Sequence, residues 1–230
     1  MNIELLEVAA EALDDLLDEV VFVGGATLEL WITRQGAVEV RPTEDVDVVV
    51  EVTTRTAFHD FEARLRAHGF AEAQDSRVIC RWRHTDSQLV LDAMPARADI
   101  LGFENRWQAA TLPHAVDREL PSGRNIRAAP PPYLLAMKLE AWSGRGRGDF
   151  LGSRDFEDIA LLLDRRAELI DEISVADADL RRYVAAEAGK LLDDPRTQGG
   201  LMGAVPPDDL SQNRVPTVLL PALSALAALD

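Results

Sequence analysis

The sequence predicts an α+β fold, in which a mixed sheet with flanking helices is followed by a helical lobe. Two observations carry this prediction: strand-length apolar runs alternate with amphipathic helical segments over residues 1–129, and helical periodicity dominates residues 130–230. Between the two halves, Pro130-Pro131-Pro132 interrupts the chain, because residues before proline avoid the helical conformation. We therefore expect a first lobe at 1–129 and a helical lobe at 130–230.

The first fifty residues predict a helix, a strand, a second helix and a second strand. Leucines recur at helical spacing over residues 4–19, and acidic residues fill the opposite face. The apolar run 20–23 reads as a buried strand that ends at Gly24-Gly25, with a short helix expected over residues 26–32. In the strand that begins at Asp45, the period of two places Asp45 and Asp47 on one face and valines on the other.

The remaining elements follow from capping residues, turn residues and periodicity. A helix capped at Thr53-Thr54 should end at Gly69, since glycine tolerates the left-handed conformation that follows a helix. We further expect hairpins from strands 77–82 with 88–92 and 115–120 with 125–129, and helices over 101–112, from near Tyr133, from Ser153 to 163, and through 165–230.

Charge is distributed unevenly along the 230 residues. The net charge of −16 divides into −11 for residues 1–54, +3 for 55–154 and −8 for 155–230, so the middle segment is the basic one. A local basic surface can attract a polyanion although the total is acidic; the alternative is a merely solvated arginine face. One cysteine, no secretory signal and no membrane-length apolar run lead us to expect a cytoplasmic protein without membrane contact.

Asp45 and Asp47 predict a magnesium–nucleotide site. Two neighbouring carboxylates repel each other unless a cation neutralises them, and oxygen ligands together with substrate phosphates suit Mg²⁺. Gly24-Gly25 would let backbone N–H groups approach a phosphate, although the spacing matches neither a P-loop nor a dinucleotide fingerprint. The alternative is an ordinary turn beside the polar face of a strand.

Three further residues are candidates for the same chemistry. Asp92 ends an apolar strand that should lie beside the Asp45 strand, where its carboxylate could accept a proton; we rank it above Asp99. Lys138 is one of two lysines beside 22 arginines, and its compact ammonium suits a phosphate contact. Asp155 could complement its helix dipole and also orient Lys138, and Asp158 is a weaker candidate.

The candidate residues and their order in the chain resemble those of the AbiEii/MenT-type nucleotidyltransferases. These are toxins of toxin–antitoxin pairs within the polymerase-beta-like nucleotidyltransferase superfamily. The resemblance covers roughly residues 20–165 in four ordered blocks. They are the Gly24-Gly25 turn with a leucine five residues on, Arg-x-Thr-x-Asp-x-Asp over 41–47, Lys138, and Arg145 and Arg147 before Arg154-Asp155-Phe156-Glu157-Asp158. Arginine stands at position 154 where the family usually carries lysine.

The resemblance implies a Mg²⁺-dependent transfer of a nucleotide from an NTP to an acceptor hydroxyl. That acceptor would be RNA, typically a tRNA 3′ end, and a cognate antitoxin would be a partner. Catalysis would rest on Asp45, Asp47, Asp92 and Lys138, with the three aspartates as metal ligands, and nucleotide binding on Gly24, Gly25, Thr43, Lys138, Arg145, Arg147 and Asp155. Two alternatives stay open, an antibiotic-type transferase with a small acceptor and a relative that binds nucleotide without turnover.

Overall fold

The computed structural model describes residues 2–52, 54–76, 78–102, 105–144 and 149–229. Contacts divide the chain into two compact units. Unit 1 comprises Met1–Leu30 and Pro42–Pro130, and unit 2 comprises Trp31–Arg41 and Pro131–Asp230.

Segment Trp31–Arg41 groups with the helical unit, whereas the sequence-based division placed it in the first lobe. Hydrogen bonds between residues that are far apart in the sequence explain the difference. The backbone N–H groups of Thr33 and Arg34 donate to the Arg165 carbonyl at 3.0 and 3.2 Å. The fully buried carboxylate of Asp164 accepts from the N–H of Val38 at 2.8 Å.

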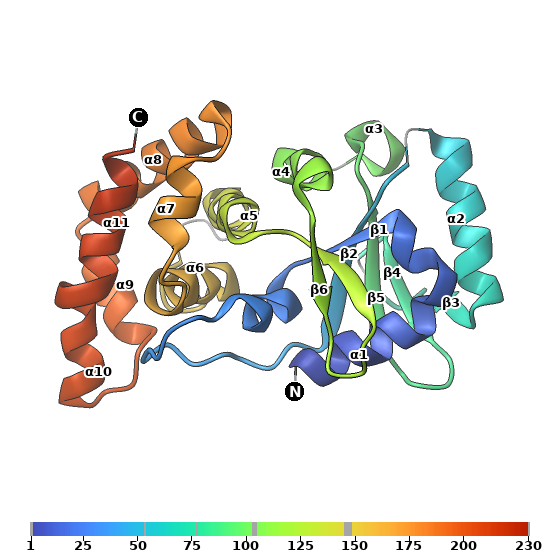
Figure 1. Ribbon diagram of the computed structural model, residues 1–230, viewed down its shortest axis with the longest axis horizontal. Coiled ribbons are helices and arrows are strands. Elements are labelled where there is room, and N and C mark those ends of the chain that lie inside the picture. Colours follow the sequence, from blue (N-terminus) through green and yellow to red (C-terminus); the bar gives the residue numbers. More distant parts are fainter. Residues whose placement is uncertain (1, 53, 77, 103–104, 145–148, 230) are drawn as a thin grey trace. The chain divides into compact units, whose positions relative to one another are not determined.

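Unit 1 contains a seven-stranded sheet in the order β3-β4-β5-β2-β1-β7-β6 within the described residues (Figure 1). Parallel pairing of β2 with β5 and of β1 with β7, among otherwise antiparallel neighbours, makes the sheet mixed, as the sequence predicts. The strands are β1 (Val20–Val23), β2 (Asp45–Val50), β3 (Phe70–Glu72), β4 (Arg81–His84), β5 (Val90–Pro95), β6 (Val116–Glu119) and β7 (Asn125–Ala128).

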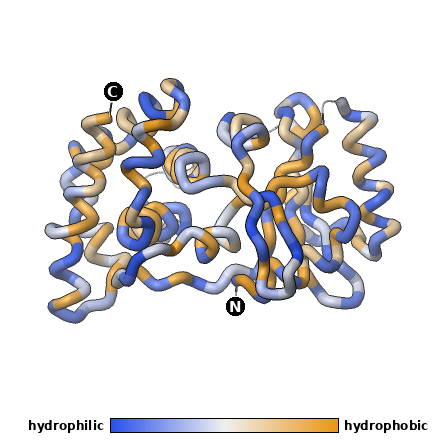
Figure 2. The backbone as a smooth tube through the Cα atoms, in the orientation of Figure 1, coloured by the Kyte–Doolittle hydropathy of each residue, from blue (hydrophilic) through white to orange (hydrophobic). Residues whose placement is uncertain are grey.

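The centre of the sheet is apolar and its β6 edge is polar. All four residues of β1 are buried, and β2 is buried except at its two aspartates. The outer strand β6, with the sequence Val-Asp-Arg-Glu, is mostly exposed and hydrophilic (Figure 2). Charged side chains on an edge strand discourage pairing with another chain.

The helices of unit 1 follow the predicted caps. Thr54 caps α2 by accepting the N–H of Ala57, and Gly69 follows the helix with φ of +82°. Phe58 and Phe61 form part of the buried face of α2. The helical elements are α1 (Asn2–Leu13), the 3₁₀ segments η1 (Asp14–Glu19) and η2 (Gly25–Trp31), α2 (Arg55–Ala67), α3 (Ala98–Leu101), α4 (Arg106–Thr111) and the 3₁₀ turn η3 (Leu112–His114).

Several predicted boundaries were wrong. The segment after Gly24 is a 3₁₀ helix, and the predicted helix over 101–112 is divided between α3, α4 and η3. The strand predicted over residues 77–82 begins only at Arg81, and β3 was missed. A three-residue strand has almost no periodicity of its own, so β3 is specified by its pairing with β4.

Unit 2 is helical, as predicted, and α5 (Pro131–Gly144) packs against three other helices. A helix buried on most of its surface is apolar all round, and α5 therefore lacks a polar face. The other elements are α6 (Arg154–Arg165), capped by Ser153, α7 (Leu169–Ser174), α8 (Ala178–Asp193), α9 (Thr197–Gly203), α10 (Asp209–Arg214), the π-helical turn η4 (Val215–Leu219) and α11 (Leu220–Ala227). No helix within the described ranges is long and apolar enough to cross a membrane.

Candidate active site

Strand register brings three carboxyl groups onto one face of the sheet in unit 1. Asp45 and Asp47 lie two residues apart on β2, so their side chains point the same way. The parallel pairing of β2 with β5 sets Asp92 directly beside Asp47. The predicted neighbour relation is thus confirmed, although Asp92 lies within β5, which continues to Pro95, and not at the end of the strand.

Gly24 lies against the carboxylate of Asp47. The antiparallel register pairs Val23 with Asp47, so the turn that begins at Gly24 lies next to the side chain of Asp47. Gly24 has φ of +76°, and a Cβ atom added there would lie 2.0 Å from Asp47 Oδ2. Only glycine satisfies both the left-handed backbone and this close approach. The glycine turn and the acidic strand are therefore one local structure.

Arg81, which sequence reasoning missed, joins two of the three carboxyl groups. It begins β4, where the antiparallel register sets it opposite Asp92. Its Nε and Nη2 donate to the two carboxylate oxygens of Asp92 at 2.8 and 2.7 Å, and Nη2 also donates to Asp45. The hydrogen bond with Asp92 is the main cause that raises the pKa of Arg81 above its usual value. In the sequence, the only indication of this role for Arg81 would have been that its strand pairs with one that carries an aspartate.

The single cysteine, Cys80, directly precedes Arg81 in the chain and is influenced by the charges of the acidic face. Cys80 is buried, and burial, followed by the negative charges of Asp92 and Asp47, raises the pKa of its thiol to about 12. The thiol is therefore neutral at physiological pH. A neutral thiol is a poor nucleophile and a poor metal ligand.

Two other predicted nucleotide-binding residues flank the acidic strand. Gly25 is buried and begins the 3₁₀ helix η2, and its neighbour Thr27 donates a hydrogen bond to the Gly24 carbonyl at 2.9 Å. Thr43 precedes β2, where its N–H donates to the side chain of Asn2 at 3.1 Å. The buried hydroxyl of Thr43 has no hydrogen-bond partner among the described residues.

Unit 2 contains a second ionic cluster, centred on Lys138. The ammonium group is largely buried on α5, where Nζ lies 2.6 Å from Asp158 Oδ2 and 3.2 Å from Asp155 Oδ1. Both aspartates lie in the first turns of α6 and are buried. Asp158, the weaker candidate from the sequence, makes the shorter contact. Because an unpaired buried charge is very unfavourable, this pairing permits a lysine inside an apolar helix.

Arg41 joins the lysine cluster from the segment Trp31–Arg41. Its Nη2 lies 3.1 Å from Asp158 Oδ2, and its Nε lies 3.7 Å from a carboxylate oxygen of Glu157. The Arg-x-Thr-x-Asp-x-Asp motif contains Arg41, but its spacing gave no sign that the guanidinium would pair with α6. Asp158 therefore holds two cations from distant parts of the sequence.

Two sets of predicted residues remain outside these clusters. Arg145 and Arg147 lie outside the described residues. Asp99, the competitor of Asp92, is exposed on α3 and forms an ion pair with Arg97 at 2.9 Å. That local pairing explains its residue type without a catalytic role.

Carboxylates are oxygen ligands of the kind that Mg²⁺ prefers, and unit 1 presents them on one face of its sheet. No group of three or more His, Cys, Asp or Glu side chains in the described part of the chain is arranged to hold a metal by itself. Mg²⁺ bound with a nucleotide, however, needs only one or two carboxylates, since phosphates and waters supply the other ligands. Asp45 and Asp47, on one partly exposed face, fit that requirement, and the Arg81 guanidinium shows that a cation is accommodated there.

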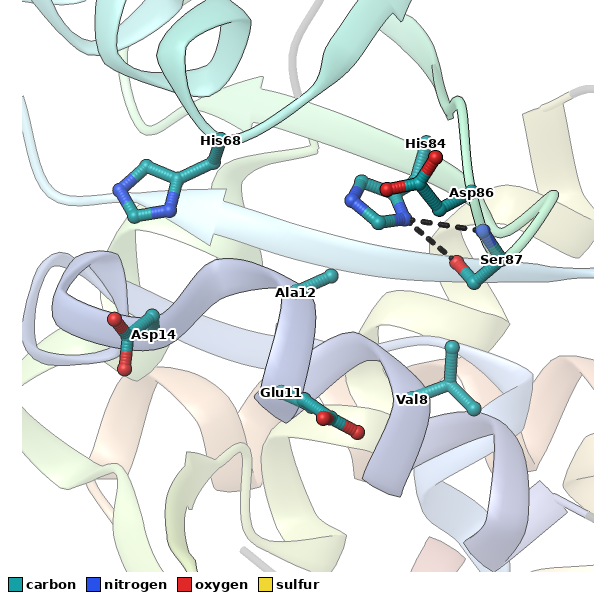
Figure 3. Close-up of a pocket in the computed structure, with 8 residues that line it drawn as sticks. All are labelled: Val8, Glu11, Ala12, Asp14, His68, His84, Asp86 and Ser87. Atoms are coloured by element: carbon teal, nitrogen blue, oxygen red, sulfur yellow. Dashed lines mark hydrogen bonds between the residues drawn. The ribbon is translucent and has the colours of Figure 1, made fainter.

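A pocket elsewhere in unit 1 has a volume of about 500 Å³ and contains none of the predicted site residues (Figure 3). His84 and Ser87 share a hydrogen bond of 2.8 Å on one side of it. His68, on the other side, lies 2.8 Å from Asp15. Both histidines are thus held by protein groups, and we assign no ligand to this pocket.

The family comparison gives the class of protein to which this α+β fold belongs. The family model described as "Nucleotidyl transferase AbiEii toxin, Type IV TA system" matches residues 8–223. The chain belongs to this AbiEii family. It is therefore a nucleotidyltransferase and the toxin component of a type IV toxin–antitoxin system, with a nucleotide substrate and an antitoxin as partner. The predictions of family, enzyme class and fold are confirmed.

Comparison with curated proteins gave no match. Among solved structures, the chain is similar to one titled "Crystal structure of JHP933 from Helicobacter pylori". The TM-score is 0.46 at 14% sequence identity, and the alignment covers 99% of this chain and 89% of that one.

Proposed function

We propose that the enzyme transfers a nucleoside monophosphate from an NTP to an acceptor hydroxyl in a Mg²⁺-dependent reaction. The observation that carries this proposal is the register that sets Asp45, Asp47 and Asp92 on one face of two paired strands, beside the Gly24 turn. Carboxylates at this spacing suit a cation bound together with phosphates. Asp45 and Asp47 would hold Mg²⁺, with Asp92 as a further ligand, and the bound ion would neutralise charge that develops on the phosphates.

The residues of the chain would contribute positioning and proton transfer. The acceptor oxygen bonds to the α-phosphorus of the NTP, the bond from that phosphorus to the oxygen bridging to the β-phosphate breaks, and pyrophosphate leaves. Asp92 would accept the proton of the attacking hydroxyl, since it lies beside Asp47 on the same face. Little covalent chemistry is required of a protein in such an in-line displacement.

Nucleotide binding would draw on the glycine turn, Thr43 and Lys138. We assign Gly24, Gly25 and Thr43 to the nucleotide because they border the acidic strand, and the buried Thr43 hydroxyl, without a partner among the described residues, could donate to a ligand. Lys138 would contact the triphosphate, and Asp155 would orient it, as their 3.2 Å contact supports. Arg145 and Arg147, in the basic middle segment, complete this assignment.

The acceptor we favour is RNA, with a tRNA 3′ end as the MenT-type resemblance implies, and the cytoplasm as the place of action. The net charge of +3 over residues 55–154 supports a polyanionic acceptor despite the acidic total. The strong acidity of the remaining chain favours the second candidate, a small-molecule acceptor. Both candidates use the same carboxylates.

A labelling experiment tests the proposal. The protein is incubated with each α-labelled NTP, with and without Mg²⁺, and with total RNA or with small-molecule pools. We expect label to enter RNA only when Mg²⁺ is present and Asp45 and Asp47 are intact. Asp99→Asn, at an exposed aspartate paired with Arg97, is the matched control and should retain full transfer. Transfer by Asp45→Asn at the wild-type rate would refute the metal assignment.

Salt dependence distinguishes the two acceptors. If Arg145 and Arg147 contact RNA phosphates, replacing both with alanine should reduce the slope of log Kd against log salt by roughly one unit per lost contact. If they contact the triphosphate, the double variant should lose NTP affinity while the slope stays the same. A salt-independent acceptor Kd for the wild-type protein would contradict RNA as the acceptor.

A further inference from the structure

Arg81 lies on β4, which is next to β5 in the sheet, and β5 is next to β2. These neighbouring strands connect Arg81 to the acidic face. Pairing runs from Arg81 across to Asp92 and from Asp92 across to Asp47, on three adjacent strands. Directly paired residues project their side chains to the same face. The guanidinium therefore extends over the surface where the cation of the proposed reaction would bind.

The guanidinium directs two of its three nitrogen atoms, Nε and Nη2, at the acidic side chains. Nε and Nη2 form a two-point contact with Asp92, and Nη2 also reaches Asp45. Arginine suits this bridging better than lysine, since its planar group presents several donors in a fixed geometry. The side chain is about one quarter exposed, so it can leave the carboxylates without disrupting the core.

We propose that Arg81 is an internal counter-ion of the acidic centre that competes with the divalent cation for Asp45 and Asp92. It neutralises part of the carboxylate charge when no metal is bound, and a divalent cation must displace it. The proposal rests on the assignment of Asp45 and Asp47 as metal ligands. Arg81 is then a positioning residue that sets how tightly the metal binds.

Competition of this kind would couple metal binding to nucleotide binding. A free divalent cation that binds at Asp45 leaves the guanidinium without its carboxylate partner. A cation that arrives with a triphosphate brings additional negative charge, with which the released guanidinium can pair. Arg81 therefore disfavours binding of the metal alone and permits binding of the metal–nucleotide complex.

Arg81→Met tests the proposal with Mn²⁺ alone as the probe, titrated into nucleotide-free protein by electron paramagnetic resonance. Removing a competing positive charge at contact distance should tighten Mn²⁺ binding on the order of tenfold or more. Arg81→Lys keeps the charge without the fork and should give an intermediate Kd. An Arg81→Met Kd equal to that of the wild-type protein would overturn the proposal.

Arg83→Met is the matched control. Arg83 lies two residues along β4, on the same face, but it pairs with the exposed carboxylate of Asp75. Its replacement should leave the Mn²⁺ Kd unchanged. An equal gain in affinity from Arg83→Met would show a general effect of net charge and would overturn the specific role of Arg81.

A double variant separates failure of this proposal from failure of the proposed function. The affinity that Arg81→Met gains should be lost in Arg81→Met/Asp45→Asn. If the gain persists, the cation binds elsewhere and both assignments fail. If Mg²⁺–NTP binding of the wild-type protein depends on Asp45 while Arg81→Met leaves the Mn²⁺ Kd unaltered, only the counter-ion proposal fails. Circular dichroism spectra and melting temperatures of each variant show that it is folded.

Discussion

The two ionic clusters of this protein differ in their balance of charge. Within the described residues, the acidic face of unit 1 carries three carboxyl groups, two of which, Asp45 and Asp92, bond to the guanidinium of Arg81. The lysine cluster of unit 2 pairs two cations, Lys138 and Arg41, with the acidic side chains of α6. Among the described residues, one guanidinium against three carboxylates leaves more negative charge in unit 1 than two cations against the three acidic side chains Asp155, Glu157 and Asp158 leave in unit 2. The acidic face is therefore the more favourable place for an additional cation.

The two clusters also differ in how far their carboxylates are exposed to water. Asp45 has a side chain that is 32% exposed, whereas that of Asp158 is 3% exposed. Ions that remain in contact with water can exchange partners at low cost, and buried ions cannot. We therefore expect substitutions in unit 1 to change activity and substitutions in unit 2 to change stability as well.

The largest expected effect is the loss of transfer in Asp45→Asn and Asp47→Asn. A bound metal supplies several kcal/mol of transition-state stabilisation, so kcat/KM should fall on the order of 10³-fold or more. The melting temperature should stay the same or rise, because each substitution removes one of several like charges. Steady-state kinetics and thermal denaturation check both parts. A large drop in melting temperature would contradict the contrast between the two clusters.

Asp158→Asn should produce the largest loss of stability. It leaves the buried ammonium of Lys138 without its nearest partner, at 2.6 Å, and removes a partner of Arg41. Breaking a buried ion pair costs roughly 3–5 kcal/mol of unfolding free energy. Because Lys138 keeps its contact with Asp155, we expect a loss of about 3 kcal/mol. Urea unfolding measures the change. Asp179→Asn, in an exposed pair with Arg182, should cost less than about 1 kcal/mol.

Gly24→Ala should reduce both stability and activity. Its φ of +76° strains any residue with a Cβ atom, and that atom would also displace the Asp47 carboxylate. The free energy of unfolding should fall by about 1–3 kcal/mol. Gly123→Ala is the control, since Gly123 has φ of +86° but no atom within 4 Å of the added Cβ. If both variants keep full activity, the contact with Asp47 has no functional importance.

The smallest expected effect is a dependence of stability on alkaline pH. Burial and the nearby aspartates raise the pKa of Cys80 to about 12, from an ordinary value of 9.0 for a cysteine thiol. Above pH 9 the thiol therefore keeps its proton in the folded protein and loses it in the unfolded chain. The contribution of the thiol to the free energy of unfolding is full below pH 9 and is lost as the pH rises toward 12. The slope is at most about 1.4 kcal/mol per pH unit.

Cys80→Ala isolates that contribution. Unfolding free energies of both proteins are measured between about pH 8 and pH 10.5, the range in which the unfolded thiol ionises. The stability of the wild-type protein should decline relative to Cys80→Ala above about pH 9. Parallel curves would show that the thiol is not held neutral by its surroundings.

The sequence by itself determined the acidic strand and its glycine turn. Alternation of aspartate and valine over residues 45–50 specifies a half-buried strand, and Gly24-Gly25 marks the end of the preceding one. The helix caps at Thr54 and Ser153 were also predictable, because they depend on neighbouring residues. Local patterns specify local structure, and these predictions were confirmed.

Only the tertiary structure decided which side chains complete the clusters. Arg81 reaches the acidic face because β4 pairs with β5 in one particular register. Arg41 reaches Asp158 because Trp31–Arg41 binds to α6 through Asp164, far away in sequence. A shift of one residue in register would turn the Arg81 side chain to the opposite face. Such pairings depend on long-range packing, which no local spacing in the sequence encodes.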